Sequence, residues 1–142
     1  TIQAGLKRVV DNTGLAGRWQ ILNYSPKVIC DTAHNREGLS LVIKQLNTVS
    51  YDQLHIVFGV VDDKNLDTIL PLFPKNAIYY FCKPNVVRGL DEEELKQKAL
   101  LYSLLGQTYS SVNDAYQKSF LAAAKNDLIF VGGSTFVVAE VL

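Results

Sequence analysis

The sequence is poor in the features that mark several classes of protein. It has only two cysteines in 142 residues, too few for a disulfide framework. Lysine plus arginine and aspartate plus glutamate number 14 each, so no excess of charge favours nucleic acid or an anionic membrane as a partner. No apolar run approaches the about 20 residues of a membrane span, and no signal peptide is visible. We therefore expect a cytoplasmic globular domain in which Cys30 and Cys82 are buried and reduced.

Methionine is absent altogether, and the chain begins at Thr1. Apolar residues at helical spacing start at the second residue and predict a helix over residues 2–11. We interpret the chain as a fragment of a longer protein that forms one domain over residues 1–142. In this interpretation, residues 1–13 are the end of a helix and linker that arrive from a preceding domain.

Short apolar runs and segments of helical spacing alternate along the rest of the chain. The apolar or alternating runs predict strands at 19–23, 27–30, 54–58, 77–81, 108–109 and 128–131. Helical spacing predicts helices at 35–47, 66–72, 91–105, 113–123 and 136–142. This alternation predicts a Rossmann-like α/β domain of three layers, with a mostly parallel sheet of about six strands and helices on both faces.

The segment 31–35 (Asp-Thr-Ala-His-Asn) is the most informative part of the sequence. It follows a buried strand and precedes a helix, so it places a carboxylate, an imidazole and an amide at the carboxyl end of a strand. In open α/β sheets that edge binds ligands. Each side chain also has a plainer interpretation, with Asp31 as a cap of the next helix and His34 as a hydrogen-bonded surface histidine.

Three further loops follow predicted strands and should lie at the same edge. They carry Gly59, Asp62, Asp63 and Lys64, then Lys83, Asn85 and Arg88, and then Gly132, Gly133 and Ser134. Together these groups suit a polyanionic or amino-acid ligand, because glycines let backbone amides approach a ligand and a helix start favours anions. The structural alternatives are helix capping by the aspartates and the serine, a tight turn at the glycines, and solvated charge at the basic residues.

Several catalytic arrangements are missing from the sequence. Cys30, His34, His55 and Cys82 lack the paired spacing of a metal site, so we expect no protein-bound metal here. Ser134 lacks the Gly-x-Ser-x-Gly elbow that presents a nucleophilic serine on this kind of sheet. No Gly-x-x-x-x-Gly-Lys-Ser/Thr segment is present, so a phosphate cradle for ATP would have to lie elsewhere.

An ordered set of segments resembles a known family. The segments are Gly-Arg-Trp-Gln at 17–20, Asp-Thr-Ala-His-Asn at 31–35 with Gly38, Phe-Gly at 58–59 with Asp-Lys at 63–64, and Gly-Ser at 133–134. In this order and spacing they resemble the C-terminal domain of folylpolyglutamate synthase/dihydrofolate synthase, within the Mur ligase superfamily. The chain departs from the family pattern at Arg36, where proline is common, and at residues 12–16, which lack the usual Trp-Pro.

The resemblance implies an ATP-dependent ligase of folate biosynthesis and one-carbon metabolism. Such an enzyme phosphorylates a carboxylate of dihydropteroate or a folate and joins it to L-glutamate. The P-loop and the Mg²⁺ ligands would belong to a preceding central ATPase domain, so we expect the 142 residues alone to be inactive. The present domain would help to bind ATP and glutamate and would close over the site, which excludes water from the acyl phosphate.

Matching positions in the family imply roles for individual residues. Arg18 is assigned to the ATP phosphates and Asp31 to the nucleotide; because a carboxylate repels phosphates, a contact with ribose or base suits Asp31 better. His34 and Ser134 are assigned to the catalytic site, where they would present the incoming glutamate or close the site. The weaker candidates for substrate binding are Asn35, Lys64 and Arg88.

Other interpretations stay open at this point. The C-terminal domain of a peptidoglycan Mur ligase resembles the segment 31–35 nearly as well, although its usual ending after the last strand differs. A non-catalytic module that binds a nucleotide or an amino acid would require no preceding ATPase domain, and neither would a structural docking domain. The resemblance does not separate dihydrofolate synthase from folylpolyglutamate synthase or from an enzyme with both activities.

Overall fold

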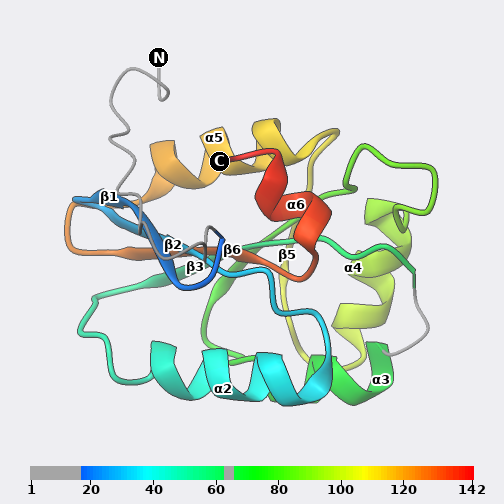
Figure 1. Cartoon of the computed structure of the whole chain (residues 1–142), viewed down its shortest axis with the longest axis horizontal. Helices are drawn as coiled ribbons and strands as arrows, with labels where there is room; N and C mark the ends of the chain where they lie inside the picture. The colour runs from blue at the N-terminus through cyan, green and yellow to red at the C-terminus, as the bar shows by residue number, and fades with distance from the viewer. Residues whose placement is uncertain (1–16, 63–65) are drawn as a thin grey trace.

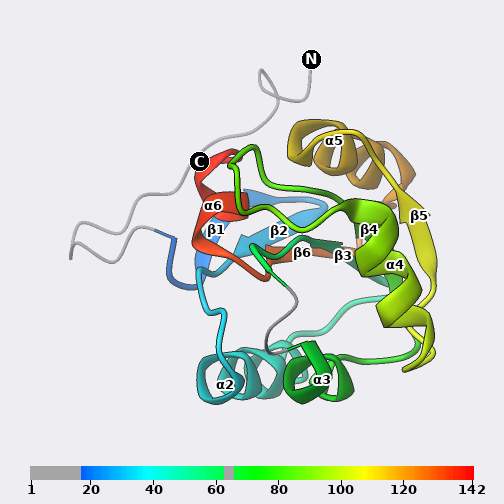
Figure 2. The same ribbon diagram turned by 90° about the vertical axis from the view of Figure 1, so that its right-hand side faces the viewer.

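The computed structural model describes residues 17–62 and 66–142, which form a six-stranded sheet between layers of helices (Figures 1 and 2). The expected helix over residues 2–11 lies outside this range. The elements are β1 (Gln20–Tyr24), β2 (Lys27–Cys30), α2 (Arg36–Leu46), β3 (Leu54–Phe58), α3 (Leu66–Ile69), the 3-10 helix η1 (Leu70–Leu72), β4 (Ile78–Phe81), α4 (Glu92–Leu100), β5 (Gly106–Thr108), α5 (Val112–Ala122), β6 (Leu128–Gly132) and α6 (Thr135–Ala139).

The strand order is β1-β2-β6-β3-β4-β5, and only the β1–β2 pair is antiparallel. The predicted Rossmann-like α/β sheet of mostly parallel strands is therefore confirmed. β6 is the last strand in the sequence but lies between β2 and β3, with Val131 opposite both Cys30 and Val57. This central position brings the segments that follow β2, β3 and β6 to one edge of the sheet.

Two apolar clusters, one on each face of the sheet, form the core. Figure 2 shows α2 and α3 on one face and α5 and α6 on the other. Neighbouring residues of β3 contribute to opposite clusters, Ile56 and Phe58 to the first and Val57 to the second. Because both faces are covered, β3 is buried throughout and has an unbroken apolar character apart from His55. None of the helices in the described part of the chain has the length and apolar character that crossing a membrane requires.

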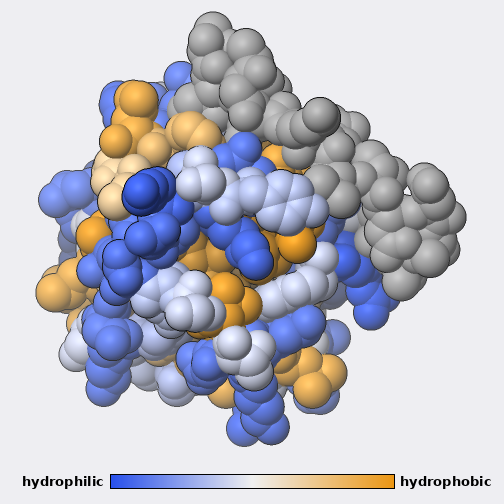
Figure 3. Space-filling model, turned by 90° about the vertical axis from the view of Figure 1, so that its left-hand side faces the viewer, coloured by the Kyte–Doolittle hydropathy of each residue, from blue (hydrophilic) through white to orange (hydrophobic). Residues whose placement is uncertain are grey.

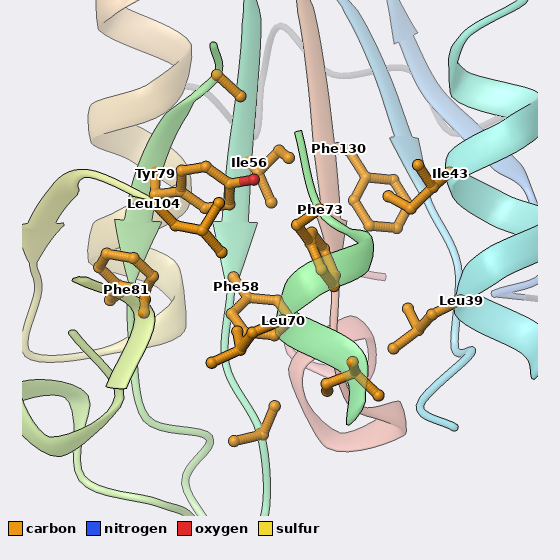
Figure 4. Packing of buried hydrophobic residues seen from close by; sticks show 14 of the residues in the cluster. Leu39, Ile43, Ile56, Phe58, Leu70, Phe73, Tyr79, Phe81, Leu104 and Phe130 are labelled. Carbon is orange, nitrogen blue, oxygen red and sulfur yellow. The ribbon is translucent and has the colours of Figure 1, made fainter. Parts of the chain in front are cut away.

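Aromatic rings fill the first cluster, beneath α2 and η1. Figure 4 shows Phe73 beside Phe58, and the centroids of the two rings are 4.8 Å apart in an edge-to-face arrangement. The rings of Tyr79 and Phe81 stack at 5.6 Å on β4. These contacts fix the strands β3 and β4, whose carboxyl ends carry two of the loops of interest.

The region around β5 differs from the prediction. The helix expected over 91–105 ends at Leu100, because Ser103 adopts a left-handed backbone (φ 64°) and the amide of Leu104 turns back to the carbonyl of Ala99. The chain then enters β5 at Gly106–Thr108, two residues before the predicted strand at 108–109. The spacing of apolar residues does not predict that a serine adopts a left-handed backbone and ends the helix there.

Other element boundaries were also predicted incorrectly. The cap of α5 is Ser111 rather than Asn113, since the Ser111 hydroxyl accepts a hydrogen bond from the amide of Asp114 at 3.0 Å. The last helix is Thr135–Ala139 rather than 136–142. β1 begins at Gln20 because Trp19, expected in the strand, has a positive φ of 46°.

Side-chain caps begin both α2 and α4. The Asp91 carboxylate accepts hydrogen bonds from the amides of Glu93 and Glu94 at 3.1 and 3.2 Å.

We expect Asp91→Ala to lower the free energy of unfolding by about 1 kcal/mol, because two helix amides lose their acceptor. Urea denaturation measures this loss. The control Asp52→Ala removes an exposed aspartate outside any helix start and should change stability by less than about 0.5 kcal/mol; equal losses in the two variants would contradict the prediction.

Candidate functional site

The loops that follow the parallel strands meet at the carboxyl edge of the sheet, as the sequence predicted. Backbone hydrogen bonds join them: the amide of Cys82 donates to the carbonyl of Phe58 at 3.0 Å, and the amide of Leu90 donates to the carbonyl of Val60 at 2.9 Å. Asp63 and Lys64 lie outside the described residues. The described parts of this edge are the segments 31–35, 59–62, 82–91 and 133–134.

Asp31 is buried at this edge, with 8% of its surface exposed. Its Oδ2 accepts a hydrogen bond from the amide of Trp19 at 2.9 Å, and its Oδ1 accepts one from the amide of Ala33 at 2.8 Å. The interpretation of Asp31 as the cap of the following helix is wrong. Asn35 caps α2 instead, since its Oδ1 accepts the amide of Gly38 at 2.8 Å. The Asp31 carboxylate thus ties two loops together.

The segment before β1 is bent at two places. Gly17 and Trp19 have positive φ angles of 83° and 46°, and Arg18 lies between them. Further hydrogen bonds hold the bend, from the Thr32 amide to the Gly17 carbonyl at 2.8 Å and from the Gly17 amide to Gln20 Oε1 at 2.7 Å. A left-handed backbone costs about 1–2 kcal/mol for a residue with a Cβ, so the strained position of Trp19 singles it out as a candidate functional residue.

A cleft of about 510 Å³ opens beside this bend. Its walls combine the exposed side chains of Arg18 and His34 with the half-buried indole of Trp19. A concave site with an apolar wall and a few converging polar groups is typical of small-molecule binding. The complete lining is Arg18, Trp19, Asp31, Thr32, Ala33, His34, Asn35, Gly38, Leu41, Val42 and Gln45.

A second hollow of about 200 Å³ adjoins the first through His34, which lines both. Arg88 and Asp62 face each other here, with Nη2 and Oδ2 3.8 Å apart, and both side chains are exposed. An exposed pair at this distance contributes little to stability, so the Arg88 guanidinium can be recruited by a ligand. The His34 Nδ1 lies 3.3 Å from the carbonyl of Thr32. Gly133 and the apolar residues Val60, Val61, Leu66 and Ile69 complete the lining.

The turn after β6 is shaped by Gly133. Its φ is 103°, and a Cβ at this position would lie 2.4 Å from the carbonyl oxygen of Gly59. Ser134 is 2% exposed, and its hydroxyl caps α6 by accepting the amide of Phe136 at 3.0 Å. The structural interpretations of both residues, a tight turn and a helix cap, are confirmed. Ser134 itself does not line either hollow, whereas its neighbour Gly133 lines the second.

Neither thiol belongs to the candidate site. Cys30 and Cys82 are both buried thiols, as expected. The Cys82 thiol donates to the carbonyl of Phe58 at 3.6 Å, and burial, with smaller contributions from Glu140 and Glu92, raises its pKa well above the ordinary value. A protonated, buried thiol is a poor nucleophile and metal ligand. Within residues 17–62 and 66–142, no three His, Cys, Asp or Glu side chains cluster in a way that suits a metal ion.

His55 lies at the opposite, amino end of the strands, in a polar network that sequence patterns did not predict. It is 2% exposed, with Nδ1 2.8 Å from the Tyr80 hydroxyl and Nε2 2.9 Å from Asp127 Oδ2. Burial, together with the charges of Tyr109 and Asp127, raises the pKa of Tyr80 to about 12. Figure 3 shows the side of the molecule on which these amino ends lie, where hydrophilic residues predominate. There Asp127 helps to line a separate hollow of about 300 Å³.

The pKa of Asp127 makes stability depend on pH. Burial alone would raise this pKa, but hydrogen bonds from His55 and the Ala124 amide, and the charge of His55, outweigh burial and hold it below its ordinary value. The unfolded chain therefore takes up a proton at this carboxylate at a higher pH than the folded protein does. The stabilisation is complete above the unfolded pKa of about 4 and is lost as pH falls through the folded value.

We expect Asp127→Asn to flatten the acid side of the stability curve. Urea denaturation between about pH 6 and pH 3 should show a smaller loss of unfolding free energy in the variant than in the wild type, because one carboxylate with a lowered pKa is gone. Asp52→Asn, which removes an exposed carboxylate, should retain the wild-type slope. A wild-type slope in Asp127→Asn would show that this carboxylate does not contribute.

Comparison with known proteins identifies the family. Residues 17–135 match the family model of the Mur ligase glutamate ligase domain. A probable bifunctional folylpolyglutamate synthase/dihydropteroate synthase of Haloferax volcanii is 31% identical over 138 residues, which cover 95% of this chain and 16% of that protein.

Solved structures agree with this assignment. E. coli FolC in complex with DHPP and ADP is 27% identical with a TM-score of 0.79, covering 89% of this chain and 30% of that one. A bifunctional folylpolyglutamate synthase/dihydrofolate synthase with Mn, AMPPNP and L-glutamate bound is 25% identical with a TM-score of 0.81, covering 92% and 32%. The chain thus spans about a third or less of the proteins it matches. It belongs to the Mur ligase family, as a C-terminal glutamate ligase domain of the folylpolyglutamate synthase/dihydrofolate synthase type.

Proposed function

We propose that the chain is the C-terminal part of an enzyme that uses ATP to join L-glutamate to dihydropteroate, a folate or both. The observation that carries this proposal is the carboxyl-edge cleft, where an exposed arginine and an aromatic wall lie next to a hollow with a second arginine. A ligase of this kind holds a nucleotide and an amino acid side by side. The relatives that bind ADP, AMPPNP or L-glutamate support the same pair of ligands.

Arg18 is the residue that we assign to the nucleotide phosphates. It is exposed, lines the larger cleft, and lies between the two residues with a left-handed backbone. A guanidinium suits phosphate oxygens because it can donate two parallel charge-assisted hydrogen bonds. The Mg²⁺ that accompanies ATP is assigned to the preceding ATPase domain of the parent protein, where the family resemblance places its ligands.

The smaller hollow is the place that we assign to glutamate. The exposed Arg88 guanidinium would bind a carboxylate in exchange for Asp62. Asn35, which lines the adjoining larger cleft, and Lys64, which lies outside the described residues, are further candidates for polar contacts with a substrate. The glutamate amine attacks the carbonyl carbon of the acyl phosphate, the bond to the phosphate oxygen breaks, and phosphate leaves. His34 lies between the two hollows and is assigned the proton that the amine releases. Ser134 holds the turn that forms one wall of this hollow.

The proposal also assigns this domain a part in closing the site. An acyl phosphate hydrolyses if water reaches it, so a cover over the reacting groups increases the yield of amide. The carboxyl-edge loops, tied to one another by hydrogen bonds, would form that cover when the domain meets the rest of the parent. A peptidoglycan Mur ligase would use the same geometry, but the relatives compared above are folate enzymes.

The test uses the full-length parent with Mg-ATP and labelled glutamate, and offers dihydropteroate and then tetrahydrofolate. Glutamate incorporation with ADP release would establish the ligase and would show which of the two activities it has. Turnover only with a muramoyl-peptide nucleotide would assign the chain to cell-wall synthesis. Nucleotide or amino-acid binding without any turnover would favour the non-catalytic module.

Substitutions in the parent should separate the two halves of the site. Arg18→Ala should raise the KM for ATP about tenfold to a hundredfold, because hydrogen bonds between charged groups contribute about 1.5–3 kcal/mol. Ser134→Ala should leave the KM for ATP unchanged and mainly raise the glutamate requirement, since it loosens the turn beside the smaller hollow. The control Lys125→Ala removes an exposed cation at the opposite edge. Unchanged kinetics in both site variants would contradict the assignment.

A further inference from the structure

The hydrogen bonds of Asp31 suggest a role other than ligand contact. The carboxylate is buried, and each oxygen already accepts a backbone amide, one from Trp19 and one from Ala33. A carboxylate directed at the nucleotide would also repel its phosphates. The structure thus turns Asp31 toward the chain's own backbone, although it lies beside the cleft.

Trp19, whose amide donates one of these hydrogen bonds, has a strained backbone. Trp19 adopts a left-handed backbone, which crowds the Cβ of any residue other than glycine and is uncommon for a bulky side chain. Such a conformation persists only where the surroundings over-determine it. The 2.9 Å hydrogen bond from the Trp19 amide to Asp31 Oδ2 supplies part of that restraint, and the bonds of Gly17 to Thr32 and Gln20 add to it.

The bend decides what the cleft presents to a ligand. Arg18 stands between the two left-handed residues, so the bend sets the direction of its side chain. Trp19 is partly buried, packs against the first apolar cluster and forms a wall of the cleft. If the bend relaxed, both the guanidinium and the indole would change position together.

We propose that Asp31 is a positioning residue, whose carboxylate holds the bend at 17–19 and thereby presents Arg18 and Trp19 to the ligand. The proposal rests on the proposed function only in naming the ligand as a nucleotide. It makes Trp19 a specificity-determining residue, because a wall at this place favours a ligand that carries a flat ring next to its anionic group.

The first test uses tryptophan fluorescence and needs no ligand. Trp19 is the only tryptophan of the chain and lies in the bend, so its fluorescence reports the bend directly. In Asp31→Asn the emission should move to longer wavelength and acrylamide should quench it more strongly than in the wild type. The matched control Asp114→Asn removes a carboxylate from α5 and should keep the wild-type emission. Unchanged emission and quenching in Asp31→Asn would overturn the proposal.

A stability cycle keeps the proposal falsifiable if the asparagine variant folds poorly. Glycine adopts the left-handed backbone readily, so Trp19→Gly removes the need for restraint at this position. The loss of melting temperature caused by Asp31→Asn, or by the milder Asp31→Glu, should be smaller in the Trp19→Gly background than in the wild type. Equal losses in both backgrounds would show that Asp31 does not act on the bend.

The second test measures nucleotide affinity in the full-length parent. Arg18→Ala and Asp31→Asn should each weaken ATP binding, by about tenfold or more. Because Asp31 acts partly through Arg18, the double variant should lose less affinity than the two single losses together. Beyond the loss of Arg18→Ala, only the effect of a displaced Trp19 should remain. Fully additive losses would mean that Asp31 contacts the nucleotide itself and would overturn the positioning role. A parent that binds no nucleotide would refute the proposed function, whereas the fluorescence test would still decide the role of Asp31.

Discussion

Gly133→Ala should destabilise the protein by about 2–6 kcal/mol, from about 1–3 kcal/mol of backbone strain and a similar contribution from overpacking. The φ of 103° at this position is unfavourable for any residue with a Cβ. That Cβ would lie 2.4 Å from the Gly59 carbonyl oxygen and 2.7 Å from the ring of Phe58. The nearest atom belongs to the backbone of a buried segment between β3 and the next loop, so a side-chain rotation cannot relieve the overlap. Urea or guanidinium denaturation measures the loss as a shift of the midpoint.

Gly38→Ala is the matched control for this substitution. Gly38 lies in the first turns of α2, and the added Cβ would meet side chains, Asn35 Oδ1 at 3.1 Å and the Ala33 Cβ at 3.2 Å. The helix propensity of alanine exceeds that of glycine by about 1 kcal/mol, which offsets this tight contact. Stability should therefore change by no more than about 1 kcal/mol. A loss of that small size in Gly133→Ala would mean that the turn after β6 can rearrange.

The location of Gly133 makes the same substitution informative about the site. Gly133 lines the smaller hollow and precedes Ser134, the cap of α6. A variant that still folds must have moved this turn away from Gly59. In the parent enzyme we therefore expect the glutamate requirement to rise more than the requirement for ATP.

The core strands could be predicted from the sequence because a strand that is buried on both faces has an almost unbroken run of apolar residues. The runs at 54–58 and 128–131 are almost wholly apolar, and they became β3 and β6, the central pair of the sheet. The short edge strand β5 has no such apolar run. Its three residues, Gly106–Thr108, are only partly buried or exposed, and its start depends on the left-handed Ser103 that ends the helix before it.

The carboxyl-edge loops were predictable from topology, whereas the contacts within them were not. A strand followed by a helix predicts that the segment 31–35 lies at the ligand edge, and the structure places it there. Local rules allow either Asp31 or Asn35 to cap the helix. The outcome depends on the Trp19 amide, which lies 12 residues away in the sequence and gives Asp31 another partner.

His55 illustrates the limit of pattern-based prediction. A histidine within an apolar strand is compatible with a surface position, a ligand role or a buried hydrogen bond. Its two partners, Tyr80 and Asp127, are 25 and 72 residues away, and they meet only because β4 and β6 flank β3. The strand order therefore had to be known before this network was visible.

His55→Leu is the second substitution for which we expect a large effect, a loss of about 3–5 kcal/mol in the free energy of unfolding. Leucine is apolar and similar in size, so the principal loss is that of two buried hydrogen bonds rather than of packing. Asp127 keeps the amide of Ala124 at 2.9 Å but loses the imidazole, and the Tyr80 hydroxyl, in a residue only 5% exposed, loses its partner. A buried polar group without a partner is destabilising because the unfolded chain gives it water.

His34→Leu is the control, since the His34 side chain is exposed and its ring nitrogen lies 3.3 Å from the Thr32 carbonyl oxygen. The stability of this variant should stay within about 0.5 kcal/mol of the wild type. The triple replacement His55→Leu, Tyr80→Phe and Asp127→Leu removes every member of the network at once. It should be more stable than His55→Leu alone, because the carboxylate and the hydroxyl that lose the imidazole in His55→Leu are gone; the part-buried amide of Ala124, which loses its acceptor, makes the smaller loss. If the triple variant were the less stable of the two, the network would contribute net stability as a unit, beyond the satisfaction of its own polar atoms.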